Sequence, residues 1–209
     1  DLGVDGFKLD AGDLRDYRIE DRTRAGNGPT GQCEAWAGLA AEYTFNELRA
    51  CWKMGGRPLA QRLHDKPSRW GAGGLGSLIP EAIAQGVIGA VFNCPDMIGG
   101  GDVSYVAEGA LDQELFVRFA QCSALFPMMQ FSTAPWRVLD AEHLAAVRAA
   151  VDLRQSLLGD IMALVQHAAD SGEPILRPLA YHHRGYDTVH DQFLLGEDLL
   201  VAPVLERGA

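Results

Sequence analysis

Three acidic residues of this chain stand where a short apolar run ends and a turn begins. They are Asp10, Asp65 and Asp96. An ionised carboxylate in such a position can act as a nucleophile, and a protonated one can act as a general acid. Acidic residues also favour turns for structural reasons, so one of them alone would be read as a loop residue. The repetition of the pattern is what indicates a site.

The first of these acids lies in GVDGFKLDAGD, residues 3–13. The alternation from Val4 to Leu9 predicts a core strand, and the small residues that follow Asp10 allow a tight turn before a second acid, Asp13. Side chains alternate between the two faces of a strand, so Lys8 shares a face with Asp10. We expect Lys8 to pair with Asp10 or with Asp13.

Apolar patterns along the chain predict strands that alternate with helices. The predicted strands are 4–9, 45–51, 59–63, 90–93, 128–132, 174–181 and 192–204. The predicted helices are 33–43, 75–88, 111–126 and 141–169, the last one capped by Asp140 and stopped at Gly172. Residues 13–31 are rich in charge, glycine and proline, which predicts a long surface loop over the site.

Alternating strands and helices indicate parallel βα units, in which the carboxyl ends of the strands meet on one face. The predicted fold class is therefore α/β, namely the C-terminal part of a (β/α)₈ TIM barrel. A complete barrel of this kind needs about 250 residues, more than the 209 of this chain. The chain opens on Asp1 rather than on a methionine, and we expect it to be an internal, incomplete piece of a longer protein.

Composition narrows the class of partner. The formal net charge of −10 and the pI near 5.0 argue against nucleic acid and anionic membranes, and favour a neutral substrate. No apolar run approaches the roughly 18 residues of a membrane-spanning helix. The four cysteines are widely spaced without a CxxC motif, and the histidines at 182, 183 and 190 have irregular spacing, so neither set predicts a metal site.

Several segments together resemble glycoside hydrolase family 31. GVDGFKLDAGD resembles the nucleophile segment of that family, with Asp10 in the place of the nucleophile. RLHDKPSRWG, residues 62–71, resembles the acid/base segment, with Asp65 as the acid/base. CPDMIGGG resembles the next segment, in which an aspartate, here Asp96, lies in the sugar pocket. FPMMQFSTAPW, GEPILRPL and DQFLLGEDLLVAPVL extend the resemblance over essentially the whole chain.

The resemblance implies a retaining α-glycosidase that cleaves a terminal α-linked hexose with two aspartates and without a metal or organic cofactor. It also implies a catalytic barrel at residues 1–195 and the start of a C-terminal β-sandwich domain at 196–209. Arg49 stands sixteen residues before Asp65, where the family places a substrate-binding arginine. Ser132 and Arg62 replace a histidine and a tryptophan of many α-glucosidases, a change shared with a subgroup implied to cleave α-galactosides. Galactose and glucose therefore both stay open.

Retaining hydrolysis needs two carboxyl groups about 5–5.5 Å apart, and Asp10 with Asp65 would be that pair. Asp65 must be protonated to release the leaving group. Trp70 could favour this by excluding water, and Arg62 would oppose it. Arg49 and Asp96 are the candidates for orienting sugar hydroxyls, because hydrogen bonds to charged groups are directional and strong.

Two alternatives stay open. The chain could belong to a non-catalytic carbohydrate-binding relative, or be an inactive fragment of the same fold. It could instead come from a divalent-metal hydrolase that uses Asp10, Asp13 and Asp16, although a metal-binding loop motif is missing around these acids. The sequence leaves linkage, compartment and oligomeric state open.

Overall fold

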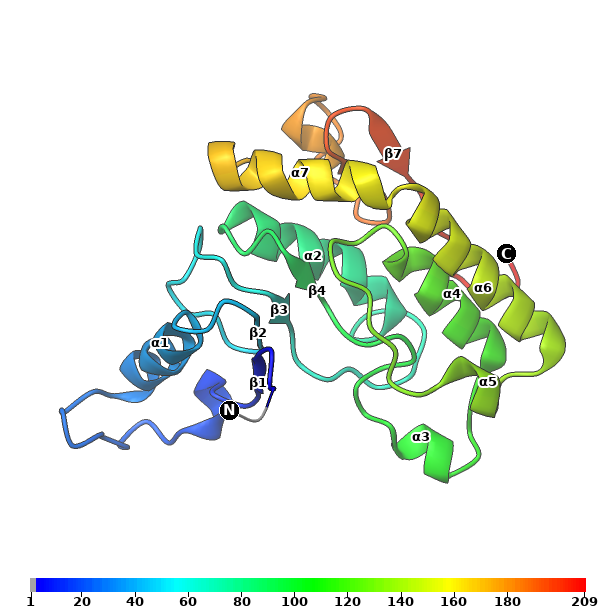
Figure 1. Cartoon of the computed structure of the whole chain (residues 1–209). Coiled ribbons are helices and arrows are strands. Elements are labelled where there is room, and N and C mark those ends of the chain that lie inside the picture. Colours follow the sequence, from blue (N-terminus) through cyan, green and yellow to red (C-terminus); the bar gives the residue numbers. More distant parts are fainter. Residues whose placement is uncertain (1–2) are drawn as a thin grey trace.

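Four short parallel strands run through the N-terminal half of the chain (Figure 1). In the computed structural model, which describes residues 3–209, they are β1 (Phe7–Leu9), β2 (Asn46–Leu48), β3 (Gln61–Arg62) and β4 (Asn93–Cys94). They form one sheet in the order β1-β2-β3-β4, and every neighbouring pair is parallel. The predicted α/β class and parallel pairing are thus confirmed, while the extension to an eight-stranded barrel stays a prediction.

Helices pack against this sheet and against each other. They are α1 (Pro29–Ala40), α2 (Leu78–Val87), α3 (Ser104–Ala107), α4 (Gln113–Ser123), α5 (Pro135–Val138), α6 (Ala141–Ser156) and α7 (Leu158–Ser171), with 3₁₀ turns at Leu14–Asp16, Leu75–Ser77 and Leu179–Tyr181. A large apolar core lies among α2, α4, α6, α7 and the C-terminal strands, and includes Ile79, Phe116, Phe119, Phe126 and Phe193. A smaller core holds α1 against β1 and β2 through Leu9, Ala37, Ala40, Leu48 and Leu59.

The predicted helix at 141–169 is interrupted and forms α6 and α7. Asp140 caps α6 as predicted, since its side chain accepts a hydrogen bond from the backbone N–H of His143, and Gly172 ends α7 in the left-handed conformation at φ 81°. The break falls at Leu157, whose φ of −105° and ψ of 7° leave the helical region. A glycine at 159 weakens helix propensity directly after it.

The predicted strand at 128–132 is reduced to a single parallel bridge between Phe131 and Ile98. The segment before it is held by Arg154 of α6, whose guanidinium donates to the carbonyls of Ala124, Phe126 and Pro127 at 3.0, 2.6 and 2.8 Å. Backbone hydrogen bonds still join residues 128–132 to β4 and to the loop after it, since the N–H of Met128 donates to Asn93, that of Ile98 to Gln130 and that of Ser132 to Ile98.

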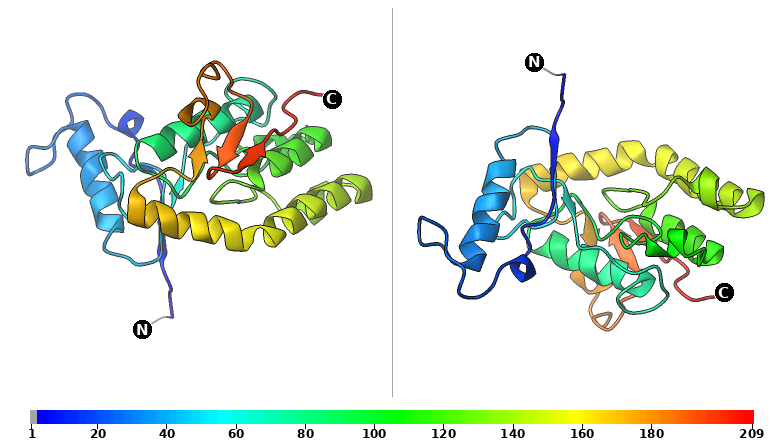
Figure 2. Two further views of the ribbon diagram at one scale, coloured as in Figure 1. Left: turned by 90° about the horizontal axis from the view of Figure 1, so that it is seen from above. Right: turned by 90° about the horizontal axis from the view of Figure 1, so that it is seen from below.

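A second sheet closes the chain. It contains β5 (Leu176–Arg177), β6 (Phe193–Leu195) and β7 (Leu199–Val201), which are antiparallel in the order β5-β6-β7. Viewed from above and below, this sheet lies between α2 and α7 (Figure 2). The predicted strand at 174–181 is therefore shorter than expected, and 192–204 is a hairpin rather than one strand. The proposed domain boundary at 195/196 falls in the turn of that hairpin and stays a prediction; residues 1–2 lie outside the described part.

The predicted surface loop at 13–31 is exposed along most of its length and projects outward beside α1 rather than across the sheet (Figure 1). Its first residue, Asp13, is the one that reaches the strand ends, through Arg49. No helix within residues 3–209 is both long and apolar enough to cross a membrane.

Candidate active site

Each parallel strand delivers one charged residue to the same edge of the sheet. Asp10 and Arg49 directly follow β1 and β2, Asp65 comes three residues after β3, and Asp96 comes two residues after β4. Because the strands are parallel, their carboxyl ends share one edge, as the sequence analysis predicted. This edge is the candidate active site.

Arg49 lies at the centre of the site. Its Nη2 is 2.9 Å from Oδ1 of Asp10 and 3.3 Å from Oδ2 of Asp65, and its Nη1 is 3.4 Å from Oδ2 of Asp13. The guanidinium is largely buried, with a side chain that is 12% exposed. A single nitrogen therefore contacts both acids of the proposed catalytic pair, so the structure brings Asp10 and Asp65 together.

The surroundings of Asp10 favour its charged form. Partial burial raises its pKa, but the backbone N–H of Ala11 and the positive charges of Arg49, Arg62 and Lys8 outweigh that effect, and the pKa of Asp10 is lowered. Its side chain is 56% exposed. An ionised and accessible carboxylate is what a nucleophile requires.

The pKa of Arg49 is shifted in the opposite direction from that of Asp10. Burial lowers its pKa, whereas Asp65, Asp10 and Asp13 raise it more strongly, and the net effect is a raised pKa. The cation is therefore fixed in its charged state by the acids that it holds.

The turn after Asp10 depends on two small residues. Ala11 and Gly12 both adopt left-handed conformations, at φ 59° and 78°. A Cβ on Gly12 would lie 2.3 Å from Cδ1 of Trp36 in α1. A side chain at position 12 would collide with Trp36. Glycine is therefore required at this point of the turn from Asp10 to Asp13.

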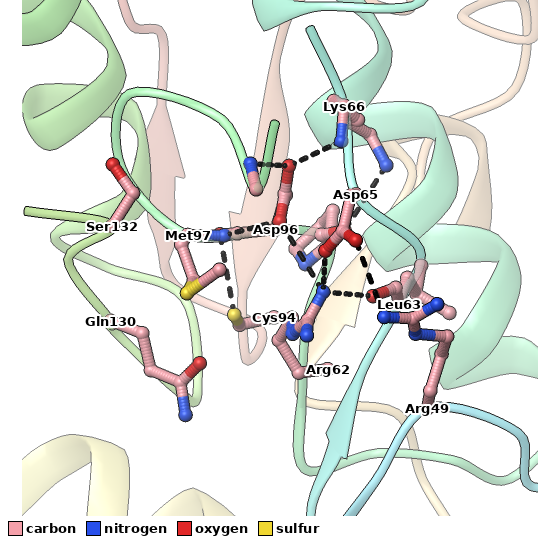
Figure 3. Close-up of polar contacts among 12 residues, drawn as sticks. Arg49, Arg62, Leu63, Asp65, Lys66, Cys94, Asp96, Met97, Gln130 and Ser132 are labelled. Carbon is pink, nitrogen blue, oxygen red and sulfur yellow. Dashed lines mark hydrogen bonds and ion pairs between the residues drawn. The ribbon is translucent and has the colours of Figure 1, made fainter. Parts of the chain in front are cut away.

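Asp65 is held from a second side by Arg62. The Nη1 of Arg62 lies 2.5 Å from Oδ1 of Asp65 and donates to the carbonyl of Leu63 at 2.9 Å (Figure 3). The Arg62 side chain is only 3% exposed, whereas that of Asp65 is 38% exposed. Arg62 therefore contacts the candidate acid/base from the buried side, as its predicted effect on Asp65 requires, and its direct binding of substrate stays a prediction.

Asp96 is also behind the site rather than in it. Its side chain is fully buried, and its oxygens accept three backbone hydrogen bonds, from Lys66 at 2.6 Å, Gly101 at 2.7 Å and Met97 at 2.7 Å (Figure 3). Burial raises its pKa despite these donors. All of these contacts are with protein, and the predicted direct contact of Asp96 with a sugar finds no support in them.

Lys8 has a different partner from the one predicted. Its Nζ is 3.3 Å from Oε1 of Glu47, the residue directly opposite it in the β1–β2 register, and Gln130 donates to the other carboxylate oxygen of Glu47. The expected pairing with Asp10 or Asp13 was wrong, although the charge of Lys8 still contributes to the lowered pKa of Asp10.

The contacts of Trp70 differ from those that the sequence predicted. Its indole N–H donates to Asp112 at 2.9 Å, and the guanidinium of Arg207 lies 5.8 Å from the centre of its ring. These contacts bind Trp70 to the start of α4 and to the C-terminal segment. The prediction that Trp70 excludes water from Asp65 finds no support in these contacts.

Ser132 is hydrogen-bonded on both sides. Its hydroxyl donates to the carbonyl of Ile98 at 2.6 Å and is 2.9 Å from the hydroxyl of Tyr105, a nearly buried residue of α3. Sequence reasoning missed Tyr105, which lies four residues after the CPDMIGGG segment but carries no pattern of its own. It also missed Lys66 and Gly101, for which the run of three glycines after Asp96 was an available signal of close backbone packing.

Gly101 provides a test of the packing around Asp65. A Cβ at this position would lie 2.3 Å from Oδ1 and 2.8 Å from Cβ of Asp65. We expect Gly101→Ala to displace the carboxylate and to lower kcat/KM for a glycoside about 10- to 100-fold, since misplacement by about 1 Å can have that effect. Steady-state kinetics measure it.

Gly159→Ala is the matched control for Gly101→Ala, because nothing lies within 4 Å of the added methyl group. It should leave kcat/KM unchanged and should not lower Tm. Equal rates for Gly101→Ala and the unmodified protein would show that the Asp65 carboxylate does not need its present position.

Asp10 and Asp13 are also two of the acids that the metal-hydrolase alternative would use as ligands. Residues 3–209 contain no group of three or more histidine, cysteine, aspartate or glutamate side chains arranged to hold a metal ion. Asp10 and Asp13 instead contact the Arg49 cation.

A parallel α/β sheet that gathers carboxylates at the carboxyl ends of its strands is typical of the sites of α/β enzymes. The sequence family described as glycosyl hydrolase family 31 C-terminal domain matches residues 172–209. Myogenesis-regulating glycosidase of Mus musculus is 36% identical over 220 residues, which are 98% of this chain and 30% of that protein. The SITS-binding protein of Tetronarce californica is 34% identical over 158 residues, covering 72% and 22%. The chain belongs to glycoside hydrolase family 31.

Solved structures agree on the fold. A family 31 sulfoquinovosidase from E. rectale superposes with a TM-score of 0.79 at 23% identity, and the match covers 99% of this chain and 34% of that chain. The chain thus spans about a third or less of the length of the relatives and structures that it matches.

Proposed function

We propose that the protein containing this chain is a retaining α-glycoside hydrolase that releases a terminal α-linked hexose of the galactose or glucose type. The observation that carries the proposal is the shared contact of Asp10 and Asp65 with Nη2 of Arg49. This contact keeps two carboxyl groups at the same strand edge, one of them with a lowered pKa.

In this mechanism Asp10 is the nucleophile. Its carboxylate attacks the anomeric carbon and forms a glycosyl ester, while the carboxyl group of Asp65 transfers its proton to the departing glycosidic oxygen. Asp65, now ionised, then takes a proton from water as the water attacks the same carbon, and Asp10 is released as a carboxylate. The two inversions give net retention of the α configuration. No step uses a metal or an organic cofactor.

The names of the relatives support a glycosidase, and the chemistry of the edge supports a neutral sugar. Asp10 and Asp65 are exposed enough to meet a ligand, whereas Arg62 and Asp96 are buried behind them. Arg49, with 12% of its side chain exposed, is the residue we propose for contact with a sugar hydroxyl. We assign Asp13 the role of holding Arg49 in place, and Lys8 that of adding positive charge near Asp10.

We further propose that the four parallel strands are part of a (β/α)₈ catalytic barrel covering residues 1–195, and that 196–209 begin a C-terminal β domain. Exposed apolar side chains in β1 and just before β1 and β2 support this, because Phe7, Val4 and Phe45 are 50%, 58% and 72% exposed. Large apolar side chains at the edge of a parallel sheet are ordinarily covered by further strands and helices.

The proposal is tested with the whole polypeptide in which this chain occurs and with nitrophenyl α-galactoside and α-glucoside. We expect release of nitrophenol from one of them, with the α-anomer of the free hexose appearing first in the NMR spectrum. Initial appearance of the β-anomer would contradict the retaining mechanism. Binding of the sugar without any turnover would instead identify a non-catalytic carbohydrate-binding relative.

A further inference from the structure

The two loops that follow β3 and β4 are joined through Asp96. One oxygen of its buried carboxylate accepts the N–H of Lys66, the residue after Asp65, and also the N–H of Gly101. The other oxygen accepts the N–H of Met97. A single side chain therefore sets the distance between two loops. One is the loop after β3, which carries Asp65 (the Asp65 loop), and the other is the loop after β4, which carries the glycines at 99–101 (the glycine loop).

The same two loops meet at further points. The carbonyl of Lys66 accepts a hydrogen bond from the N–H of Asp102 at 3.2 Å. A Cβ on Gly100 would lie 2.5 Å from that carbonyl oxygen, and a Cβ on Gly101 would touch the Asp65 carboxylate. The packing leaves no room for Asp65 to shift toward the glycine loop.

The Lys66 side chain ties the Asp65 loop to α2 and to the residue after β4. It is completely buried, and its Nζ contacts Oε2 of Glu81 on α2 at 2.6 Å and the carbonyl of Pro95 at 3.1 Å. Lys66, the residue directly after Asp65, is therefore held at two backbone groups, its N–H and its carbonyl, and at its side-chain ammonium.

We propose that Asp96, together with the Lys66–Glu81 ion pair, is a positioning group that aims the Asp65 carboxyl at the glycosidic oxygen. This inference rests on the proposed function, since it concerns the general-acid step. Asp96 itself touches no substrate, because its side chain is fully buried and all its contacts are with protein. It acts through the backbone N–H of Lys66, directly after Asp65, and through that of Gly101, which packs against the Asp65 carboxylate.

The matching substitution is Asp96→Asn. Three N–H donors converge on the carboxylate of Asp96, and an asparagine offers one acceptor oxygen and an NH₂ group in place of the second oxygen. One of the loop N–H groups then faces another donor, which loosens the tie between Asp65 and the glycine loop. The shape of the side chain is unchanged.

The readout is the dependence of kcat/KM on the leaving group. An α-hexosyl fluoride departs without protonation, whereas methyl α-hexoside needs the general acid. We expect Asp96→Asn to lower kcat/KM for the methyl glycoside about 100-fold and for the fluoride less than about 5-fold, the same pattern that Asp65→Ala should give more strongly. Asp102→Asn is the control on the same loop, because its exposed side chain caps only the N–H of Ser104, and it should alter neither value.

Several outcomes would overturn the inference. An equal loss on both substrates, or a rise in KM alone, would assign Asp96 to general folding or to substrate binding. If Asp96→Asn does not fold, Glu81→Gln replaces it, since Glu81 is partly exposed and holds the Lys66 ammonium; an unchanged leaving-group dependence in that variant would refute the role of the ion pair. If the unmodified protein hydrolyses neither substrate, the proposed function itself fails, which is a distinct result.

Discussion

Asp10→Asn should reduce the hydrolysis of a nitrophenyl α-glycoside by at least about 10⁴-fold, the size of effect seen when a catalytic nucleophile is removed. An amide cannot form the glycosyl ester, and the 2.9 Å contact with Arg49 shows that the carboxylate lies beside Asp65. Because the Asp10 side chain is 56% exposed, the change should leave the fold intact. Initial rates at saturating substrate, with circular dichroism for the fold, measure the effect.

Asp13→Asn is the matched control for this experiment. Asp13 also contacts Arg49, at 3.4 Å, and it lies three residues further along the same turn. We assign it support rather than chemistry, and therefore expect a loss of about 10-fold or less, as for a residue that only orients another. Similar rates for the two variants, or a loss in Asp13→Asn that exceeds that in Asp10→Asn, would place the nucleophile elsewhere.

The position of the site could be predicted because it depends on local pattern. Short apolar runs followed by Asp10, Arg49 and Asp65 define strand ends, and parallel pairing then brings strand ends to one edge. None of these steps requires knowledge of which side chains meet.

The partners of the charged residues could not be predicted, because they depend on register and burial. The alternation of side chains along a strand placed Lys8 on the same face as Asp10. The β1–β2 register, however, sets Lys8 directly opposite Glu47 on the neighbouring strand, and Lys8 forms its ion pair with that carboxylate. Asp96 carries the same charge as Asp10 at an equivalent strand end. The backbone of the glycine loop closes over Asp96 and turns it into a buried acceptor.

Other differences come from contacts that are distant in sequence. Trp70 donates to Asp112, forty-two residues later, so that its environment is set by the packing of α4. The strand expected at 128–132 pairs through one bridge, and three carbonyls just before it accept hydrogen bonds from Arg154 of α6. Propensity alone does not report such side-chain hydrogen bonds.

Replacing Arg49 with methionine should have the second largest effect. Three carboxylates, Asp10, Asp13 and Asp65, would lose their common cation and repel one another. We expect kcat/KM to fall about 100- to 1000-fold, since a charged group placed beside the reacting atoms contributes on that scale. We expect the free energy of unfolding to fall by about 2 kcal/mol, between the values for exposed and buried ion pairs. Urea denaturation measures the latter.

The stability loss in Arg49→Met should depend on pH in a defined direction. The folded-state pKa of Asp10 lies below its ordinary value of 3.8, and Arg49 is one of the charges that lower it. A lowered folded-state pKa stabilises the fold above the unfolded pKa, and this stabilisation is lost as the pH falls through the folded pKa. The gap between the unmodified protein and Arg49→Met should therefore be full at pH 7 and shrink below about pH 4.

The exposed Arg15 serves as the control for Arg49→Met. It contacts Asp13 and Asp16 at 3.8 and 4.0 Å with a side chain that is 61% exposed, so Arg15→Met should change the free energy of unfolding by less than about 0.5 kcal/mol at any pH. A deficit in Arg49→Met that is as large at pH 3 as at pH 7 would show that lost packing, and not lost charge, is responsible. The positions of Asp10, Asp13 and Asp65 would then be set by the strand ends rather than by the charge of Arg49. The remaining role of Arg49 would be to bind the substrate.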